Sequence, residues 1–210
     1  HYDSRLAADN KAYGMDHLDL YKKEVYDFVD SLFDEYLSGE DPVFVGPEVH
    51  IGTDEYNVNE SEQFRRFTNH CMDLVAKYGK MPRLWGSLKI MKGETPVDLK
   101  GKVVSAWNYN WMDVNTCLEA GAKVVNLCDW LLYLVPAVNY YHDFLDYQWL
   151  YESWMPEMMR KDDPKVEKRN PNFLGAMLAV WNDRVGNGIS QQDVHVRTFP
   201  ALQVVCEKMW

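Results

Sequence analysis

Two adjacent carboxylates, Asp54 and Glu55, are the residues of this sequence best suited to chemistry. Carboxyl groups serve as general acids, general bases and nucleophiles, and they follow an extended run that ends near His50. In a strand, successive side chains alternate faces, so His50, Gly52 and Asp54 would share one side and Glu55 would take the other. Both carboxylates can therefore enter one pocket only if the chain turns, and Gly52 gives a turn room. A solvated loop is the alternative for such a pair.

The strand that delivers this pair is expected over 43–52, where β-branched and aromatic residues follow a turn at Asp41-Pro42. Apolar residues at helical spacing predict helices over 16–37, with Asp16 as a cap, and over 59–78. Further strands are expected at 82–87, 102–107, 123–128 and 174–181, and further helices at 114–120, near 144–153 within an irregular segment 131–172, and at 191–207. Strands that alternate with helices predict βαβ units and a parallel sheet.

The fold class that follows is α/β, with a partial (β/α)8 TIM barrel over residues 1–210. Five strands in 210 residues are too few for a closed barrel, which takes about 250 residues, so the N-terminal strands are expected to be missing. The opening His1 and the lack of a signal-peptide pattern also indicate a piece of a longer protein. An open doubly wound sheet is the rival, although no glycine-rich phosphate loop is present. The exposed edge at the missing strands would invite pairing with another copy.

Composition excludes several classes of partner. A formal net charge of -10 argues against nucleic acid, which binds through clustered Lys and Arg. The sequence has no run of 18 or more apolar residues, so no membrane span is predicted. The cysteines are widely spaced without a Cys-x-x-Cys pattern, so neither a zinc site nor a disulfide scaffold is indicated, and no cofactor is expected. We expect four buried thiols, at Cys71, Cys117, Cys128 and Cys206.

Aromatic residues gather at the carboxyl ends of the expected strands, which is where active sites of parallel barrels lie. They are Trp85, Trp107, Tyr133 and Trp181, with Asp183 close behind the last. A single Trp is more often a core residue, but three at the same end of the sheet predict the walls of one pocket. A ring-shaped, partly apolar ligand would fit between them.

The sequence His50-Ile51-Gly52-Thr53-Asp54-Glu55 resembles the His-x-Gly-x-Asp-Glu motif that ends the fourth barrel strand of the family 20 glycoside hydrolases, the β-N-acetylhexosaminidases. Thr53, together with Leu132-Tyr133-Leu134-Val135-Pro136 and Trp181-Asn182-Asp183, is most similar to the bacterial cell-surface branch with streptococcal hexosaminidases and lacto-N-biosidases. The resemblance runs from about Asp16 to the closing helix. It implies the C-terminal part of the catalytic domain, roughly strands 4–8, and an extracellular or cell-surface location.

This resemblance implies a substrate-assisted retaining mechanism on glycans ending in β-linked GlcNAc or GalNAc. Glu55 would be the general acid and base, and Asp54 would orient the 2-acetamido group of the sugar. Trp85, Trp107 and Trp181 would line the sugar pocket, Tyr133 would donate to the acetamido oxygen, and Asp183 would bind sugar hydroxyls. His50 would support Asp54 from behind, unless it is a satisfied core histidine.

The sequence also departs from the family pattern. Asp183 stands where many members carry Glu, and Val135 stands where the usual Tyr-Leu-Asp has its carboxylate. The sugar-binding Arg of the first barrel strand, and an acidic residue and His near the third, have no counterpart. We therefore expect weak substrate binding, or no activity, from this 210-residue piece alone.

Three alternatives to a hexosaminidase remain open. One is a lacto-N-biosidase, which would release a disaccharide. Another is a non-catalytic sugar-binding module, in which the aromatic residues form a platform and the carboxylates accept hydrogen bonds. The third is a hydrolase whose metal is held by His50, Asp54, Glu55 and Asp129, which requires at least three of these ligands to converge.

Overall fold

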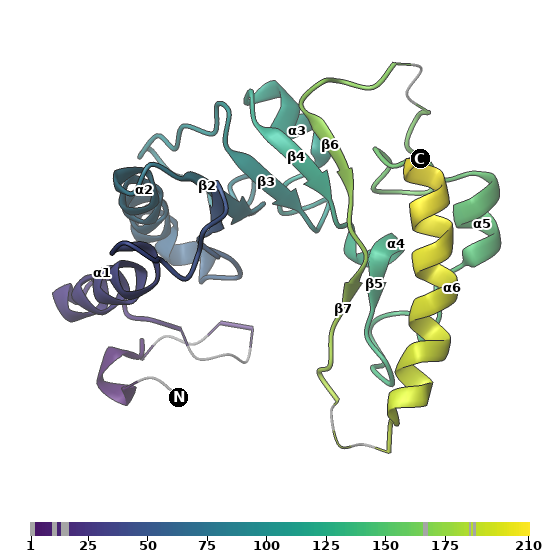
Figure 1. Ribbon diagram of the computed structural model, residues 1–210, viewed down its shortest axis with the longest axis horizontal. Coiled ribbons are helices and arrows are strands. Elements are labelled where there is room, and N and C mark those ends of the chain that lie inside the picture. Colours follow the sequence, from purple (N-terminus) through teal and green to yellow (C-terminus); the bar gives the residue numbers. More distant parts are fainter. Residues whose placement is uncertain (1–2, 10–11, 14–16, 166–167, 185, 187) are drawn as a thin grey trace.

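A five-stranded parallel sheet forms the centre of the molecule (Figure 1). The computed structural model describes residues 3–9, 12–13, 17–165, 168–184, 186 and 188–210. In spatial order the strands are β1 (Glu48–His50), β2 (Met81–Trp85), β3 (Val103–Ala106), β4 (Lys123–Asn126) and β6 (Phe173–Ala176). The spatial order of the strands is the same as their order in the chain. A doubly wound sheet requires a point at which this order reverses. The predicted α/β parallel sheet is therefore confirmed, and the doubly wound alternative is wrong.

Helices flank the sheet along its length. They are α1 (Lys23–Leu37), α2 (Ser61–Lys77), α3 (Val114–Glu119), α4 (Asp129–Leu132), α5 (Tyr147–Glu152) and α6 (Gln191–Met209), with 3-10 turns η1 (Ser4–Leu6) and η2 (Val58–Glu60). In Figure 1 the sheet forms an arc, with α1 and α2 at one end and α5 and α6 beyond the other. None of the described helices is long and apolar enough to cross a membrane.

The predicted strand over 174–181 is instead two strands in two sheets. β6 pairs with β4, while β7 (Ala179–Val180) pairs with β5 (Tyr133–Leu134). A register shift between Val124 and Val125 bends the ladder, and Gly175 adopts φ 137° beside it. The short helix α4, which the sequence pattern did not predict, separates β4 from β5. The chain after β4 therefore leaves the five-stranded sheet, and β7 pairs with β5 in a separate two-stranded sheet.

Other predicted boundaries were too generous. The strand expected over 43–52 is only Glu48–His50, because Val43 and Val45 are exposed and only the later residues reach β2. The helix expected over 16–37 begins at Lys23, and its predicted cap, Asp16, lies outside the described residues. The helix expected near 144–153 is a six-residue helix capped by Asp146.

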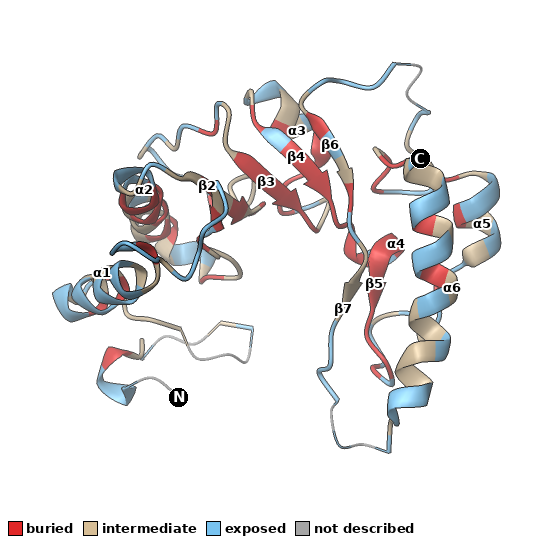
Figure 2. Ribbon diagram, in the orientation of Figure 1, coloured by how far each residue is buried: buried red, intermediate tan, exposed pale blue. Residues whose placement is uncertain are grey.

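Two buried clusters pack on opposite faces of the sheet. Val104 and Ala106 of β3 belong to the large cluster under the helices, whereas Val103 and Trp107 belong to a smaller cluster on the other face. Figure 2 shows buried residues concentrated along β3 and β4. Three cysteines are buried free thiols as expected, but the prediction for Cys206 was wrong, because it lies on the exposed side of α6.

Candidate active site

The turn that carries the two carboxylates has an unusual backbone. Gly52 has φ 76°, Thr53 has φ 61° and Glu55 has φ 44°, all in the left-handed region. This conformation is disfavoured for a β-branched residue such as Thr53, so the surrounding contacts must hold it. A Cβ on Gly52 would meet no atom within 4 Å, which means that glycine is needed here for its φ and not for space. The turn brings Asp54 and Glu55 into the same pocket.

Residues from the N-terminal segment hold this turn from outside. His17 Nε2 lies 2.8 Å from the Glu55 carbonyl oxygen, and the Tyr56 hydroxyl donates to the Leu18 carbonyl at 3.0 Å. The sequence interpretation missed these contacts, because nothing local in the sequence relates residues 17–18 to 55–56.

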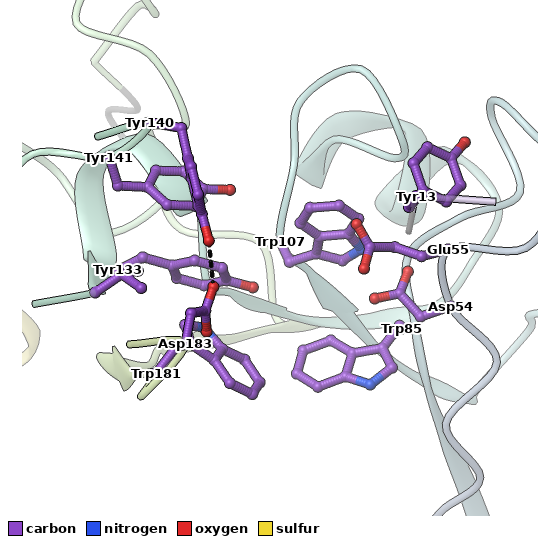
Figure 3. Close-up of a pocket in the computed structure, with 11 residues that line it drawn as sticks. Tyr13, Asp54, Glu55, Trp85, Trp107, Tyr133, Tyr140, Tyr141, Trp181 and Asp183 are labelled. Carbon is purple, nitrogen blue, oxygen red and sulfur yellow. Dashed lines mark hydrogen bonds between the residues drawn. The ribbon is translucent and has the colours of Figure 1, made fainter. Parts of the chain in front are cut away.

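A pocket of about 640 Å³ lies between two groups of side chains (Figure 3). The first group, here called the carboxylate wall, comprises Tyr13, Asp54, Glu55, Trp85 and Trp107. The second group, here called the tyrosine wall, comprises Tyr133, Tyr140, Tyr141, Trp181 and Asp183. Val135 also lines the pocket. The structure therefore brings together all seven residues predicted to bind or react with substrate, and adds Tyr13, Val135, Tyr140 and Tyr141.

Tryptophan rings connect the two walls. The ring centroids of Trp85 and Trp181 are 6.3 Å apart, and Trp181 lies 5.6 Å from Tyr133. Trp107 packs against Trp111 at 5.3 Å. Flat aromatic faces around a cavity suit a ligand that is apolar on its faces and polar at its edges.

Burial sets the proton affinity of the carboxylates. It raises the pKa of Asp54 from 3.8 to about 7, and the negative charge of Glu55 adds to the shift. The Ser87 hydroxyl donates to Asp54 Oδ1 at 2.8 Å, which opposes this rise by favouring the ionised form. Burial also raises the pKa of Glu55, with a further contribution from Asp183. Burial therefore favours the protonated form of both carboxyls, and for Asp54 this effect reaches neutral pH.

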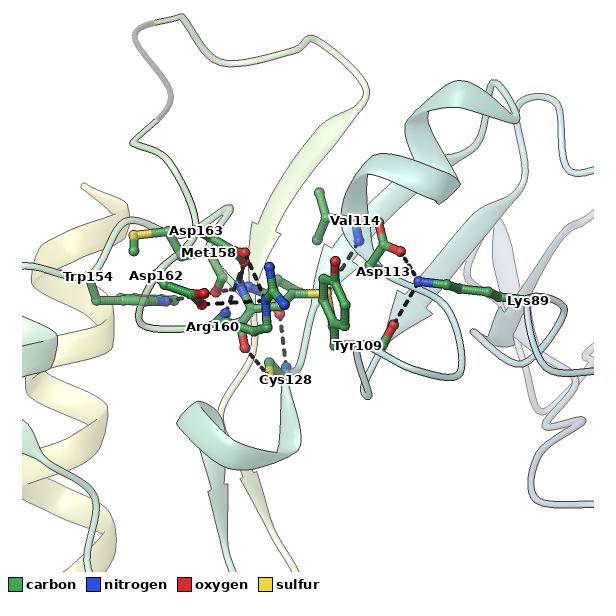
Figure 4. Close-up of polar contacts among 12 residues, drawn as sticks. Lys89, Tyr109, Asp113, Val114, Cys128, Trp154, Met158, Arg160, Asp162 and Asp163 are labelled. Carbon is green, nitrogen blue, oxygen red and sulfur yellow. Dashed lines mark hydrogen bonds and ion pairs between the residues drawn. The ribbon is translucent and has the colours of Figure 1, made fainter.

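The loops behind the carboxylate wall are tied together by charged contacts (Figure 4). Lys89, two residues after Ser87, donates to Asp113 Oδ2 at 2.7 Å and to the Tyr109 carbonyl at 3.2 Å. The Arg160 guanidinium lies 4.1 Å from the centroid of the Tyr109 ring. These contacts join the loop that presents Ser87 to the loop that follows Trp107.

His50 was predicted to support Asp54, but among the described residues no hydrogen bond joins the two side chains. Its Nδ1 accepts from the Gly52 N–H at 3.1 Å, and its ring centroid lies 4.9 Å from that of Trp85. Ser87, which no sequence signal singled out, is the side chain bonded to Asp54. Residue His50 therefore supports the turn and the Trp85 ring.

The metal hypothesis required several ligands to converge. Across the described ranges, no group of three or more His, Cys, Asp or Glu residues is placed to hold a metal ion. Asp129, one of the four proposed ligands, instead accepts hydrogen bonds from Asn108 and Tyr141.

The sequence profile of the catalytic domain of glycosyl hydrolase family 20 matches residues 3–210. The chain belongs to this family. No curated protein matches it. Among solved structures, Dispersin B is similar with a TM-score of 0.69 and 19% identity, covering 92% of this chain and 61% of its own.

Two further family 20 structures are similar. The exo β-N-acetylglucosaminidase of Vibrio harveyi has a TM-score of 0.68 at 19% identity, covering 93% of this chain and 32% of its own. The N-acetyl-β-hexosaminidase of Streptomyces plicatus has a TM-score of 0.65 at 21% identity, covering 94% and 38%. At these identities the likeness shows a shared fold, that of the TIM-barrel family 20 enzymes. The chain spans less than two thirds of each of these relatives and is a partial domain.

Proposed function

We propose that this family 20 chain carries the catalytic centre of a β-N-acetylhexosaminidase, which removes terminal β-linked N-acetylhexosamine from glycans. The observation that carries the proposal is the placement of Asp54 and Glu55 side by side on one wall of a pocket, opposite tyrosines and between tryptophans.

Two adjacent carboxylates on one wall favour a substrate-assisted reaction. An ordinary retaining glycosidase places its acid and its nucleophile on opposite sides of the scissile bond, about 5–5.5 Å apart. Sequence neighbours on a single wall are poorly placed to flank one carbon atom. The nucleophile must then come from the substrate, and the oxygen of a 2-acetamido group is close enough to attack C1.

In the first step the acetamido oxygen forms a bond to C1 while the bond from C1 to the leaving oxygen breaks. Glu55 gives its proton to that leaving oxygen. In the second step Glu55 takes a proton from water, the water oxygen bonds to C1, and the bond from C1 to the acetamido oxygen breaks, which restores the acetamide. Asp54 accepts a hydrogen bond from the acetamido N–H and stabilises the positive charge of the cyclic intermediate.

Substrate would change the proton affinities of the two carboxyls. Without substrate, burial favours a proton on Asp54, whose pKa is raised to about 7. An acetamido N–H donated to Asp54 stabilises its ionised form and leaves the proton to Glu55, which needs it as general acid. Trp85, Trp107 and Trp181 would hold the sugar ring while this occurs.

The test is release of chromophore from an aryl β-N-acetylglucosaminide by a version of the protein that is active. Replacing Glu55 by Gln should lower turnover by roughly 10²–10⁴-fold, since general acid catalysis is lost. Glu119→Gln, at an exposed position of α3, is the matched control and should keep wild-type turnover. Unchanged turnover in Glu55→Gln would contradict the proposal and favour a sugar-binding module without catalysis.

The assay should also compare this chain with a version extended upstream by about 150 residues, an allowance based on the usual size of such a barrel. Activity only in the longer version would show that the proposed catalytic centre needs the rest of the domain. Activity in neither, with activity on a disaccharide glycoside, would favour the lacto-N-biosidase alternative. Val135 in the pocket lining is consistent with altered hydroxyl recognition, and the cell-surface branch and location remain part of the proposal.

Self-association is a further part of the proposal. Within the described part of the chain, β1 pairs with β2 alone, so its other edge is unpaired. In the preceding helix α1, the apolar side chains of Phe28 and Leu32 are exposed. An unpaired strand edge is a template for pairing with another chain. Sedimentation velocity should show a concentration-dependent dimer, and a monomer at all concentrations would contradict this expectation.

A further inference from the structure

The three tyrosines of the tyrosine wall use their hydroxyl protons differently. The Tyr140 hydroxyl donates to Asp183 Oδ2 at 2.6 Å, and the Tyr141 hydroxyl donates to Asp129 Oδ2 at 3.1 Å. No described residue accepts the Tyr133 proton. A phenol has one proton to donate and lone pairs to accept, so Tyr140 and Tyr141 offer only acceptors to a ligand, while Tyr133 still offers a donor.

Asp129 fixes the direction of the bond with Tyr141. It is 3% exposed, and its Oδ2 also accepts from Asn108 Nδ2 at 2.7 Å. Its Oδ1 accepts from the Trp130 N–H at 2.9 Å. Both carboxylate oxygens therefore face donors, so Asp129 acts as an acceptor towards Tyr141. The Asp129 N–H donates to the Trp107 carbonyl at 2.7 Å, which ties this group to the carboxylate wall.

We infer that Tyr140 and Tyr141 recognise hydroxyl groups of the bound sugar as hydrogen-bond acceptors, and that Asp129 is a positioning residue that sets the polarity of Tyr141. The inference rests on the proposed function and names the specificity-determining residues of the same pocket. The side chain of Val135, which also lines this region, has no acceptor to offer.

This polarity selects one orientation of a 2-acetamido sugar. The acetamido oxygen is an acceptor and matches the free donor of Tyr133, close to Asp54. The 4- and 6-hydroxyls lie on the far part of the pyranose ring and can donate to Tyr140, Tyr141 and the free oxygen of Asp183. A sugar that lacks one of these hydroxyls leaves an acceptor of the tyrosine wall unpaired, which costs affinity.

Direct binding to the upstream-extended version of the protein tests this inference without relying on turnover. Tryptophan fluorescence, which reports on Trp85, Trp107 and Trp181, is titrated with N-acetylglucosamine, its 4-deoxy analogue and its 6-deoxy analogue. Tyr141→Phe and Tyr140→Phe should each weaken N-acetylglucosamine binding roughly threefold to tenfold, as expected for one lost hydrogen bond. Each variant should lose the discrimination against one deoxy analogue. Tyr26→Phe removes a hydroxyl bonded to the Leu20 carbonyl, away from the pocket, and should bind as wild type does.

The positioning role of Asp129 has its own readout. Asp129→Asn should reduce the discrimination against the same deoxy analogue as Tyr141→Phe, and the double variant should show no further reduction. Equal weakening for all three sugars would indicate a purely structural role and overturn the assignment of Asp129. If Asp129→Asn does not fold, Asp129→Ser, whose hydroxyl can also donate to Tyr141, is tested for the same loss of discrimination in its place.

Two failures are distinguishable. Wild-type protein that binds N-acetylglucosamine but loses no affinity or discrimination in Tyr140→Phe and Tyr141→Phe overturns this inference and leaves the proposed function intact. Upstream-extended wild-type protein with no saturable binding of N-acetylglucosamine, or with equal affinity for glucose, contradicts the proposed function and the inference with it.

Discussion

The two walls of the pocket are built in different ways. The carboxylate wall draws Asp54 from the turn after β1, and Trp85 and Trp107 from the ends of β2 and β3, and these three strands are neighbours in one sheet. The tyrosine wall draws Tyr133, Tyr140 and Tyr141 from β5 and the irregular chain that follows it. The difference suggests that the reacting groups stand on a short turn anchored to the sheet, whereas recognition depends on a longer segment with little regular structure.

The two walls also differ in the free energy they store. The carboxylate wall has a turn with left-handed φ angles and a buried Asp54 whose pKa is raised to about 7. In the tyrosine wall, Tyr140 and Tyr141 have carboxylate partners, and their rings pack 5.4 Å apart. We therefore expect changes in the first wall to affect turnover and pH dependence, and changes in the second to affect affinity.

After Glu55→Gln, the largest effect is expected from Asp54→Asn. The variant keeps an acceptor for Ser87 but loses the charge that stabilises the cyclic intermediate, so turnover should fall by roughly 10²–10³-fold. Steady-state kinetics on an aryl β-N-acetylglucosaminide measures this, in a version of the protein that is active. Asp73→Asn, an exposed position of α2, serves as control. A similar loss of kcat in Tyr140→Phe would erase the distinction between the walls.

The same substitution should stabilise the protein at high pH. The Asp54 pKa is 3.8 when unfolded and about 7 when folded, so stability falls as pH rises through this window, and the cost persists above it. At about pH 8, Asp54→Asn should raise the free energy of unfolding by about 2 kcal/mol, below the full value of the shift because the side chain is partly exposed.

Urea denaturation at about pH 8 and about pH 4 measures this difference, which should vanish at the lower pH. Asp73→Asn should not reproduce the pH dependence. A variant equally stabilised at both pH values would show that burial of the Asp54 charge carries no such cost.

An intermediate effect is expected from the aromatic surface that joins the walls. Trp181→Ala removes a ring that lies against both Trp85 and Tyr133, so sugar affinity should fall about tenfold with a smaller change in kcat. Titration with N-acetylglucosamine, followed by calorimetry, gives the affinity. Trp210→Ala, at the fully exposed chain end, is the control. If Trp181→Ala bound the sugar with wild-type affinity, the Trp181 ring would not be part of the binding surface.

The smallest effect on stability is expected from substitutions of glycine. Comparing a glycine in the turn with one elsewhere separates the effect of backbone strain from the effect on function. Gly52→Ala and Gly101→Ala place a side chain at φ 76° and 74°, and neither new Cβ meets an atom within 4 Å. Each should lower the free energy of unfolding by about 1 kcal/mol. Only Gly52→Ala should also lower turnover, because it shifts the carboxylates. Equal turnover in the two variants would mean that the turn tolerates another φ.

The sequence by itself determined the alternation of strands and helices and the residues at the strand ends. Parallel strands align their carboxyl ends, so Asp54, Trp85 and Trp107 could be placed together from their position in each strand alone. The periodicity of apolar residues predicted that these elements exist more accurately than it predicted where they begin and end. The strand expected over 174–181, for example, is two strands in the structure.

Only the tertiary structure decided which side chains pair across long separations. Ser87 bonds Asp54 and Tyr141 bonds Asp129, although nothing in the local sequence relates the members of either pair. A turn at Gly52 was predicted from the sequence, but not the positive φ angles of Thr53 and Glu55, and not the contact of His17 with the Glu55 carbonyl. The physical reason is that alternation and spacing fix which face a residue occupies, whereas hydrogen-bond partners depend on how separate segments pack.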